Sequence, residues 1–137
     1  MKAAVARKAK SWAELTAGDV MERKIVAVAP SSPVSEVERL LTEHRISGMP
    51  VVDASGRAIG VVSYRDLLDH DAPQSGETVA DVMTPAIVDV TADATLAEVC
   101  RTMSRHAVHR VLVTERGTGR MLGIVSSLGV LGAITGD

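Results

Sequence analysis

Aromatic side chains are almost missing from this sequence of 137 residues, which has no Phe, one Trp (Trp12) and one Tyr (Tyr64). The core must therefore be built from Val, Leu, Ile, Met and Ala. The aromatic platforms on which many nucleic-acid-binding domains stack bases are missing as well. The composition thus gives no support to a nucleic-acid-binding domain of that kind.

Cysteine and long apolar runs are also scarce. Cys100 stands alone, which excludes both a disulfide framework within the chain and a metal cluster built on Cys. No apolar stretch approaches the roughly 18 residues of a membrane-spanning helix. No signal-peptide apolar region follows the basic start of the chain. We therefore expect a cytoplasmic protein that makes no contact with a membrane.

The net charge is only −2, but it is unevenly distributed along the chain. The first ten residues contribute +4 and contain no acid, so residues 11–137 carry −6. A negative folded body disfavours nucleic-acid binding. The basic tail is predicted to be a solvated terminus, and a nucleic-acid contact through it is the weaker alternative. Its basic residues are Lys2, Arg7, Lys8 and Lys10.

The chain repeats itself. Asp19-Val20-Met21 recurs as Asp81-Val82-Met83, an offset of 62 residues. One residue inserted after Arg57 changes the offset to 63, so that Gly60–Ser63 falls on Gly123–Ser126. A piece of about 60 residues is marginally stable alone. We therefore expect the two copies to depend on each other for a core.

Each copy has the same order of predicted elements: a strand, a helix, two strands joined by a Gly-containing turn, and a final helix. The polar stretch Asp71–Thr78 links the copies. The sequence therefore predicts a mixed α/β (α+β) fold of two β-α-β-β-α repeats packed about a pseudo-twofold axis. The predicted strands are Ile25–Val28, Met49–Val52 and Ile59–Val62 in the first copy, and Ile87–Val90, Val111–Val113 and Leu122–Val125 in the second.

Capping signals and apolar spacing fix the central helix of each copy. In the first copy Ser32 is the predicted N-cap, with Pro33 in the first turn. In the second copy Thr95 and Glu98 have the spacing of a capping box. Ser11 and Glu14 could likewise open a short helix around Trp12. The predicted buried stripes are Val34, Val37, Leu40 and Leu41 in one helix, and Leu96, Val99, Cys100 and Met103 in the other.

Three segments in this order resemble the CBS domain: D-V-M, then I-S-G-M-P-V-V-D at Ile46–Asp53, then G-V-V-S-Y-R-D-L-L at Gly60–Leu68. Two such domains in tandem form a CBS pair, or Bateman module, and the resemblance extends from residue 19 to about residue 135. It implies a regulatory module rather than an enzyme, and a homodimer. The implied divisions are an N-terminal segment at 1–18, a first repeat at 19–70, a linker at 71–80 and a second repeat at 81–137.

The resemblance also implies an adenosine-containing ligand, such as AMP, ADP or ATP, in a cleft between the repeats. The family's nucleotide signature, G-h-h-[ST]-x-x-D, is complete in the first copy, with Ser63 and Asp66. An Asp carboxylate can accept hydrogen bonds from both ribose hydroxyls. From the residues alone, Ser63 could simply cap the last helix and Asp66 could be a favourable charge in its first turn. Both interpretations stay open here.

The same cleft is expected to draw its other contacts from the second copy. The resemblance assigns Ile87 and Val88 to the adenine, and His109 and Arg110 to the phosphate, where a guanidinium can donate two hydrogen bonds. The alternative for this pair is a solvated Arg and a half-buried His at a helix end. The predicted ligand-binding set is Val61, Ser63, Arg65, Asp66, Ile87, Val88, His109 and Arg110.

The second copy breaks the signature. Gly129 stands where the Asp is expected, so that Ser126 lacks the carboxylate partner on its own helix. The second cleft is therefore predicted to be degenerate, either empty or filled by a molecule without a ribose phosphate. Its expected lining is Ile25, Val26, Ser47, Gly48 and Ser126.

Other chemistry finds little support in the sequence. His44, His106 and His109 do not form a ligand set with Cys100, so no metal is expected. No Ser-His-Asp order, Walker loop or G-x-G-x-x-G appears. Two classes of function remain: a nucleotide-sensing module that signals to an unidentified protein partner, and an interaction scaffold that binds no nucleotide. Gly129 favours the scaffold, and ligand titration separates the two.

Overall fold

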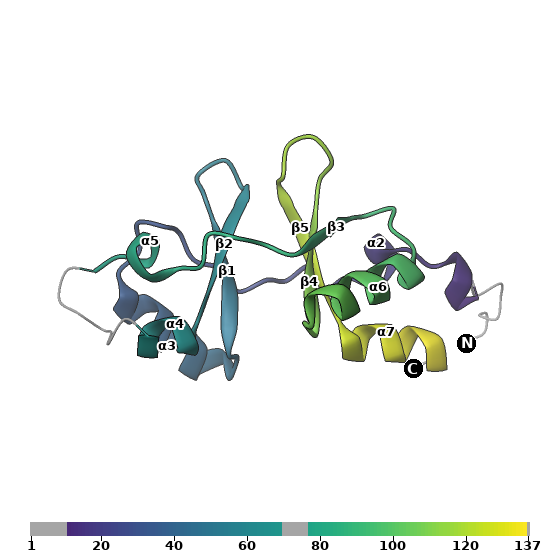
Figure 1. The fold of residues 1–137 in the computed structure, drawn as a ribbon, viewed down its shortest axis with the longest axis horizontal. Helices are drawn as coiled ribbons and strands as arrows, with labels where there is room; N and C mark the ends of the chain where they lie inside the picture. The colour runs from purple at the N-terminus through teal and green to yellow at the C-terminus, as the bar shows by residue number, and fades with distance from the viewer. Residues whose placement is uncertain (1–10, 70–76, 137) are drawn as a thin grey trace. The chain divides into compact units, whose positions relative to one another are not determined.

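The computed structural model describes residues 11–69 and 77–136. The predicted basic tail and most of the predicted linker lie outside the described residues. The chain has a mixed α/β fold, as predicted, and divides into two compact units (Figure 1). The first unit comprises Lys24–Ile87 and Arg116–Met121, and the second comprises Met1–Arg23, Val88–Glu115 and Leu122–Asp137.

The first unit is built on an antiparallel hairpin of β1 and β2, with a register shift between Val51 and Val52. Val28 adds one isolated parallel bridge to Val51. The core is almost entirely aliphatic, as the scarcity of aromatic residues predicts. The elements are α3 (Val34–His44), β1 (Gly48–Val52), β2 (Ala58–Ser63), α4 (Tyr64–Asp69) and α5 (Val79–Val82). The core residues are Val28, Val34, Val37, Leu41, Met49, Val51, Val62, Leu67, Val79 and Val82.

The second unit contains a three-stranded sheet in the order β3-β4-β5, in which β3 runs parallel to β4. Helix α6 packs beside β3 and β4 (Figure 1). The elements are η1 (Trp12–Glu14), α2 (Ala17–Val20), β3 (Asp89–Thr91), α6 (Leu96–His106), β4 (Arg110–Thr114), β5 (Met121–Ser126) and α7 (Ser127–Thr135). The core residues are Ala17, Ala94, Leu96, Val99, Met103, Val111, Val113, Val125 and Val130.

The compact units do not follow the sequence repeats, because the two D-V-M segments are exchanged. Helix α2 begins the first copy but lies in the second unit, where Ala17 N–H donates to Ala94 O at 2.8 Å. Helix α5 begins the second copy but lies in the first unit, where Val79 N–H donates to Ser32 O at 2.8 Å. The opening segment of each copy therefore completes the core built by the body of the other copy.

The two exchanged helices begin with the same capping box. Asp19 Oδ2 accepts hydrogen bonds from Thr16 N–H at 2.9 Å and Thr16 Oγ1 at 3.1 Å. Asp81 Oδ2 accepts the same two bonds from Thr78, at 2.9 and 3.1 Å. The bonds from the Thr78 backbone N–H and hydroxyl hold the pKa of the Asp81 carboxyl below its usual value. The Asp of each D-V-M segment therefore holds the start of its short helix.

The four predicted hairpin strands are confirmed, with slightly longer bounds. The predicted strand Ile25–Val28 is wrong except at Val28, whose N–H donates to Pro50 O at 3.2 Å and whose carbonyl accepts from Val52 N–H at 2.9 Å. The predicted strand Ile87–Val90 begins further along the chain than expected, as β3 (Asp89–Thr91). A run of β-branched residues favours extended backbone, but only tertiary pairing decides how many of its residues join a sheet.

The capping predictions were partly right. Thr95 and Glu98 form the predicted capping box, in which Thr95 Oγ1 accepts from Glu98 N–H at 3.1 Å. Pro33, not Ser32, is the N-cap of α3, because its backbone is extended and the carbonyl of Ser32 accepts the hydrogen bond from α5. Cys100 was predicted to be buried and is exposed. It lies at the edge of the stripe that Leu96, Val99 and Met103 bury.

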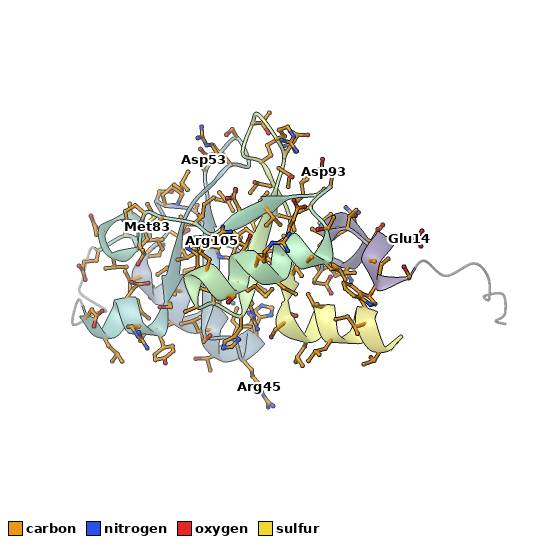
Figure 2. All side chains as sticks on the ribbon, turned by 45° about the vertical axis from the view of Figure 1, so that its right-hand side comes forward. Glu14, Arg45, Asp53, Met83, Asp93 and Arg105 are labelled. Carbon is orange, nitrogen blue, oxygen red and sulfur yellow. The ribbon has the colours of Figure 1, made fainter. Side chains whose placement is uncertain are left out.

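Helices α3 and α6 end in the same way. Arg45 and Ala107 both adopt left-handed backbone, with φ of 53° and 54°. The Arg45 N–H donates to the Leu41 and Thr42 carbonyls, and its side chain projects away from the helix end (Figure 2). The two copies therefore share this backbone conformation as well as residue types.

A glycine in the second strand of each hairpin lets another segment approach closely. A Cβ on Gly60 would lie 2.6 Å from Thr84 O, and one on Gly123 would lie 2.6 Å from Met21 Sδ and 2.9 Å from Glu22 O. Backbone oxygens at such distances cannot move without shifting the chain. These two glycines are therefore needed for the segments that follow α5 and α2 to pair with β2 and β5.

We expect Gly60→Ala to destabilise the protein by about 1–3 kcal/mol, because the added methyl group overlaps the Thr84 carbonyl. Urea unfolding followed by circular dichroism measures this change. Gly129→Ala is the matched control, since a Cβ there would meet nothing closer than Ser126 Oγ at 3.4 Å. Equal effects of the two substitutions would contradict the close-approach explanation.

Candidate functional site

The Asp66 side chain lies at a corner where the end of β2, the start of α4 and the segment after α5 meet. Its Oδ2 accepts hydrogen bonds from Ser63 N–H at 2.8 Å and from Ser63 Oγ at 3.3 Å. Its Oδ1 accepts one from Thr84 Oγ1 at 3.0 Å. We call the group of Val61, Ser63, Asp66 and Thr84 the Asp66 corner.

Backbone pairing brings Thr84 to this corner. Val61 N–H donates to Thr84 O at 3.0 Å, and Thr84 N–H donates to Val61 O at 2.8 Å. The close approach at Gly60, the residue before Val61, permits this antiparallel bridge. The Thr84 hydroxyl is thereby held next to a carboxylate 18 residues away in the chain.

In the Asp66 corner the Asp66 carboxylate is held in a fixed position and can still accept a further hydrogen bond. An ionised carboxylate offers about four lone-pair sites, and three donated bonds are seen here. Asp66 is half-buried, whereas Thr84 is exposed. The geometry suits an acceptor for a ligand with neighbouring hydroxyl groups, because the carboxylate is oriented before a ligand arrives.

Ser63 acts differently from the simple N-cap expected of it. It donates both its N–H and its hydroxyl to Asp66, so the carboxylate caps the serine backbone. The pair is therefore a capping arrangement in which Asp66 accepts and Ser63 donates, the opposite of the serine cap expected from the sequence. In the second unit Ser126 is itself the N-cap of α7, because its Oγ accepts from Gly129 N–H at 3.0 Å.

Sequence reasoning missed Thr84. It follows Met83 directly, but nothing in the periodicity links it to Asp66. The signal that could have found it is the position of Gly60, since a glycine inside a strand often marks close approach of another backbone.

The other predicted ligand-binding residues are divided between the units. Arg65 is exposed on α4 and Ile87 is half-buried, both in the first unit. Val88, His109 and Arg110 belong to the second unit. Val88 O accepts from Leu112 N–H at 3.0 Å, and His109 O accepts from Ser127 N–H at 2.9 Å.

The side chains of His109 and Arg110 are exposed, with Arg110 as the first residue of β4. The backbone around them is held by the sheet and by the start of α7, so both side chains leave from an ordered junction. A half-buried His at this position, one of the sequence alternatives, is therefore not what the structure shows.

The residues predicted to line the second cleft are likewise divided. Ile25, Val26, Ser47 and Gly48 lie in the first unit, and Ser126 lies in the second. Gly48 pairs with Ser63 across the hairpin, and Ser47 O accepts from Tyr64 N–H at 3.1 Å. Ser47 and Gly48, which were predicted to line the second cleft, therefore also lie close to Ser63.

Two further features bear on the kind of site. Over residues 11–69 and 77–136, no three His, Cys, Asp or Glu side chains gather where they could hold a metal ion. In the same part of the chain, no helix has both the length and the apolar character needed to cross a membrane.

We expect Thr84→Val and Asp66→Asn to be coupled by about 0.5–1.5 kcal/mol in a double-mutant cycle, because each removes one side of the same hydrogen bond. Urea unfolding of the two single variants and the double variant measures the coupling energy. Thr42→Val, on the exposed side of α3, replaces Thr84→Val in a control cycle that should be additive. Additivity in both cycles would show that the Thr84 bond adds nothing to stability.

The chain is similar to known proteins in both sequence and fold. The family model of the CBS domain matches residues 17–72 and 79–136. An inosine-5′-monophosphate dehydrogenase from Korarchaeum cryptofilum is 31% identical over 105 residues, which cover 77% of this chain and 21% of the dehydrogenase. The chain spans less than half the length of each of eight curated relatives that it matches.

Two groups of solved structures are similar over most of the chain. CBSX2, a CBS-pair protein of Arabidopsis thaliana, in complex with AMP has a TM-score of 0.79 and 30% identity over 89% of this chain and 97% of CBSX2. The CBS domain of a bacterial CNNM/CorC family Mg2+ transporter in complex with ATP has a TM-score of 0.77 and 26% identity, covering 92% of this chain and 91% of that one. With two matched repeats and this fold, the chain belongs to the CBS domain family.

Proposed function

We propose that this protein is a regulatory module that binds an adenosine nucleotide at the Asp66 corner and passes the signal to a protein partner. The observation that carries the proposal is the Asp66 carboxylate, fixed by Ser63 and Thr84. Support comes from CBSX2, which was solved with AMP, and from the transporter CBS domain, which was solved with ATP. The matches to dehydrogenases and transporters concern only a minor part of those proteins and support no catalytic role here.

In the proposed complex, Asp66 accepts hydrogen bonds from the ribose hydroxyls. Val61, Ile87 and Val88 contact the adenine, and the phosphate is held by His109 and Arg110, with Arg65 nearby. The exposed Arg110 guanidinium can donate two parallel bonds to phosphate oxygens. The regulatory ligand would thus be AMP, ADP or ATP.

The proposed mechanism is a shift between orientations of the two units. Asp66 belongs to the first unit, and His109 and Arg110 belong to the second. A ligand that contacts both favours the orientation in which all its contacts are made. The difference in ligand affinity between the orientations then sets the size of the signal.

We also propose that the protein is a homodimer that uses α7. Leu128, Leu131 and Ile134 are 77%, 54% and 46% exposed on this helix, which contains no charged residue. Exposed apolar side chains gathered on one helix mark an interaction surface. The same surface is the observation that favours the alternative function, a scaffold that works through protein contacts without a nucleotide.

We expect Asp66→Ala and Arg110→Ala each to weaken nucleotide binding at least tenfold, because each removes a charged group that contacts the ligand. Isothermal titration with AMP, ADP, ATP and S-adenosylmethionine measures the affinity and the number of ligands per chain. Asp69→Ala and Arg101→Ala, at exposed positions of α4 and α6, are the matched controls.

Unchanged affinity in both variants would refute the assignment of the site. Absence of binding by the unmodified protein with all four ligands would refute the sensing function and favour the scaffold.

We expect the double substitution Leu128→Glu and Leu131→Glu to convert a dimer into a monomer, because it places charges on the apolar face of α7. Sedimentation velocity at several concentrations measures the change. Ser104→Glu, on the exposed side of α6, should leave the dimer intact. A double variant that sediments as the unmodified dimer would exclude α7 as the interface.

A further inference from the structure

The turn of the second hairpin pairs with the turn of the first hairpin. The segment Arg116–Met121, which leads into β5, belongs to the first unit, and so does the turn between β1 and β2. Arg57 and Arg120 lie directly opposite each other there, in an isolated antiparallel bridge. We call these two residues the arginine pair. They come from different copies of the repeat but lie in one compact unit.

The hydrogen bonds around this bridge bring the two arginine side chains close together. Ala58 N–H donates to Gly119 O at 3.2 Å, and Met121 N–H donates to Gly56 O at 2.9 Å. Both bonds are made by the residues next to the arginines, so the arginines themselves form a non-hydrogen-bonded pair. In such a pair the Cα atoms are about 4.5 Å apart and opposite side chains are at their closest.

A glycine in each turn leaves room for the arginine of the other turn. A Cβ on Gly119 would lie 3.2 Å from both Cγ and Nε of Arg57, and a Cβ on Gly56 would lie 3.5 Å from Arg120 Nε. The two glycines have φ of 75° and 88°, a conformation that favours glycine. Each arginine side chain therefore extends along the opposite turn.

Both arginine side chains are exposed. Over residues 11–69 and 77–136, neither guanidinium forms a salt bridge. Asp53, at the start of the first turn (Figure 2), accepts from the Ser55 hydroxyl at 2.7 Å and from the backbone N–H of Arg57 at 3.0 Å. Its carboxylate therefore holds the backbone of the turn and leaves the Arg57 guanidinium able to bind another group.

The paired turns are positive, whereas the protein is negative. Residues 53–57 and 115–120 contain three arginines and two acids, a net charge of +1, but residues 11–137 together carry −6. Like charges directly opposite each other on paired strands are destabilising. Anionic groups bound to the arginine pair would remove this repulsion.

We propose that the arginine pair is a docking surface for a partner protein, where the two guanidiniums bind carboxylates of a short acidic segment of that partner. A guanidinium can donate two parallel hydrogen bonds to one carboxylate. The surface shares no residue with the Asp66 corner. The inference therefore goes beyond the nucleotide-binding function proposed above and does not require it.

A short acidic segment fits this surface better than a nucleic acid does. A long polyanion is repelled by the net charge of −6 on residues 11–137. Neither turn contains an aromatic side chain on which a base could stack. A few carboxylates can bind the arginine pair with less of this repulsion.

We expect Arg57→Gln and Arg120→Gln each to weaken binding of a labelled oligoglutamate peptide about fivefold or more, because each removes one guanidinium. The double variant should lose the binding. Fluorescence anisotropy at physiological ionic strength, without nucleotide, measures the affinity. The matched control is the double variant Arg101→Gln and Arg105→Gln, at exposed positions of α6, which changes the net charge equally and should leave the affinity within about twofold.

Replacing both members of the arginine pair by lysine keeps the charge but removes the planar fork of donors. We expect Arg57→Lys with Arg120→Lys to weaken peptide binding about threefold or more. Binding as tight as that of the unmodified protein would overturn recognition by paired guanidinium hydrogen bonds.

The remaining outcomes are equally decisive. No peptide binding by the unmodified protein, or equal losses in the double Gln variant and the α6 control, would overturn the docking surface. Tighter binding of a labelled oligothymidylate, lost in the same double variant, would overturn the acidic segment and make nucleic acid the partner. Peptide binding that depends on the arginine pair, in a protein that binds no AMP, would support this inference and refute only the proposed nucleotide sensing.

Discussion

The candidate site depends on a short antiparallel bridge between Thr84 and Val61, and Glu22 forms the same bridge with Ile124 in the second unit. Each bridge joins the segment after a D-V-M helix to the second strand of a hairpin from the other copy. Gly60 and Gly123 make the approach possible. The bridges add to the hydrogen bonds and buried side chains that attach α5 and α2 to the cores that they complete. Without the bridge to Val61, Thr84 would not reach Asp66.

The bridges also decide which side chain lies beside the second strand of each hairpin. At the Asp66 corner a threonine meets an aspartate, and the hydrogen bond between them fixes the carboxylate. In the second unit Glu22 takes the backbone place of Thr84, and the Ser126 hydroxyl caps α7 by accepting from Gly129 N–H. The same backbone bridge therefore carries different side chains in the two units.

Much of the fold could be predicted from the sequence alone. The offset of 62 residues, the two hairpins and the Thr95–Glu98 capping box depend on local patterns, and all three are found in the structure. The predicted strand at Ile25–Val28 failed because its pairing depends on one contact with β1. Burial of Cys100 failed because helical spacing does not show where a buried stripe ends. At the candidate site, Asp66 could be named from its motif, whereas Thr84 could not.

The sequence by itself determined the residue types that repeat: the D-V-M segments, the strand glycines, and Ser63 with Asp66. These are local signals, since each depends on spacing within a few residues. Only the tertiary structure decided that the D-V-M segments are exchanged between the units, and hence that Thr84 meets Asp66 and that Glu22 takes the matching place beside Ile124. The reason is that these contacts join residues far apart in the chain, and no periodicity in a sequence specifies which strand edge a distant segment will pair with.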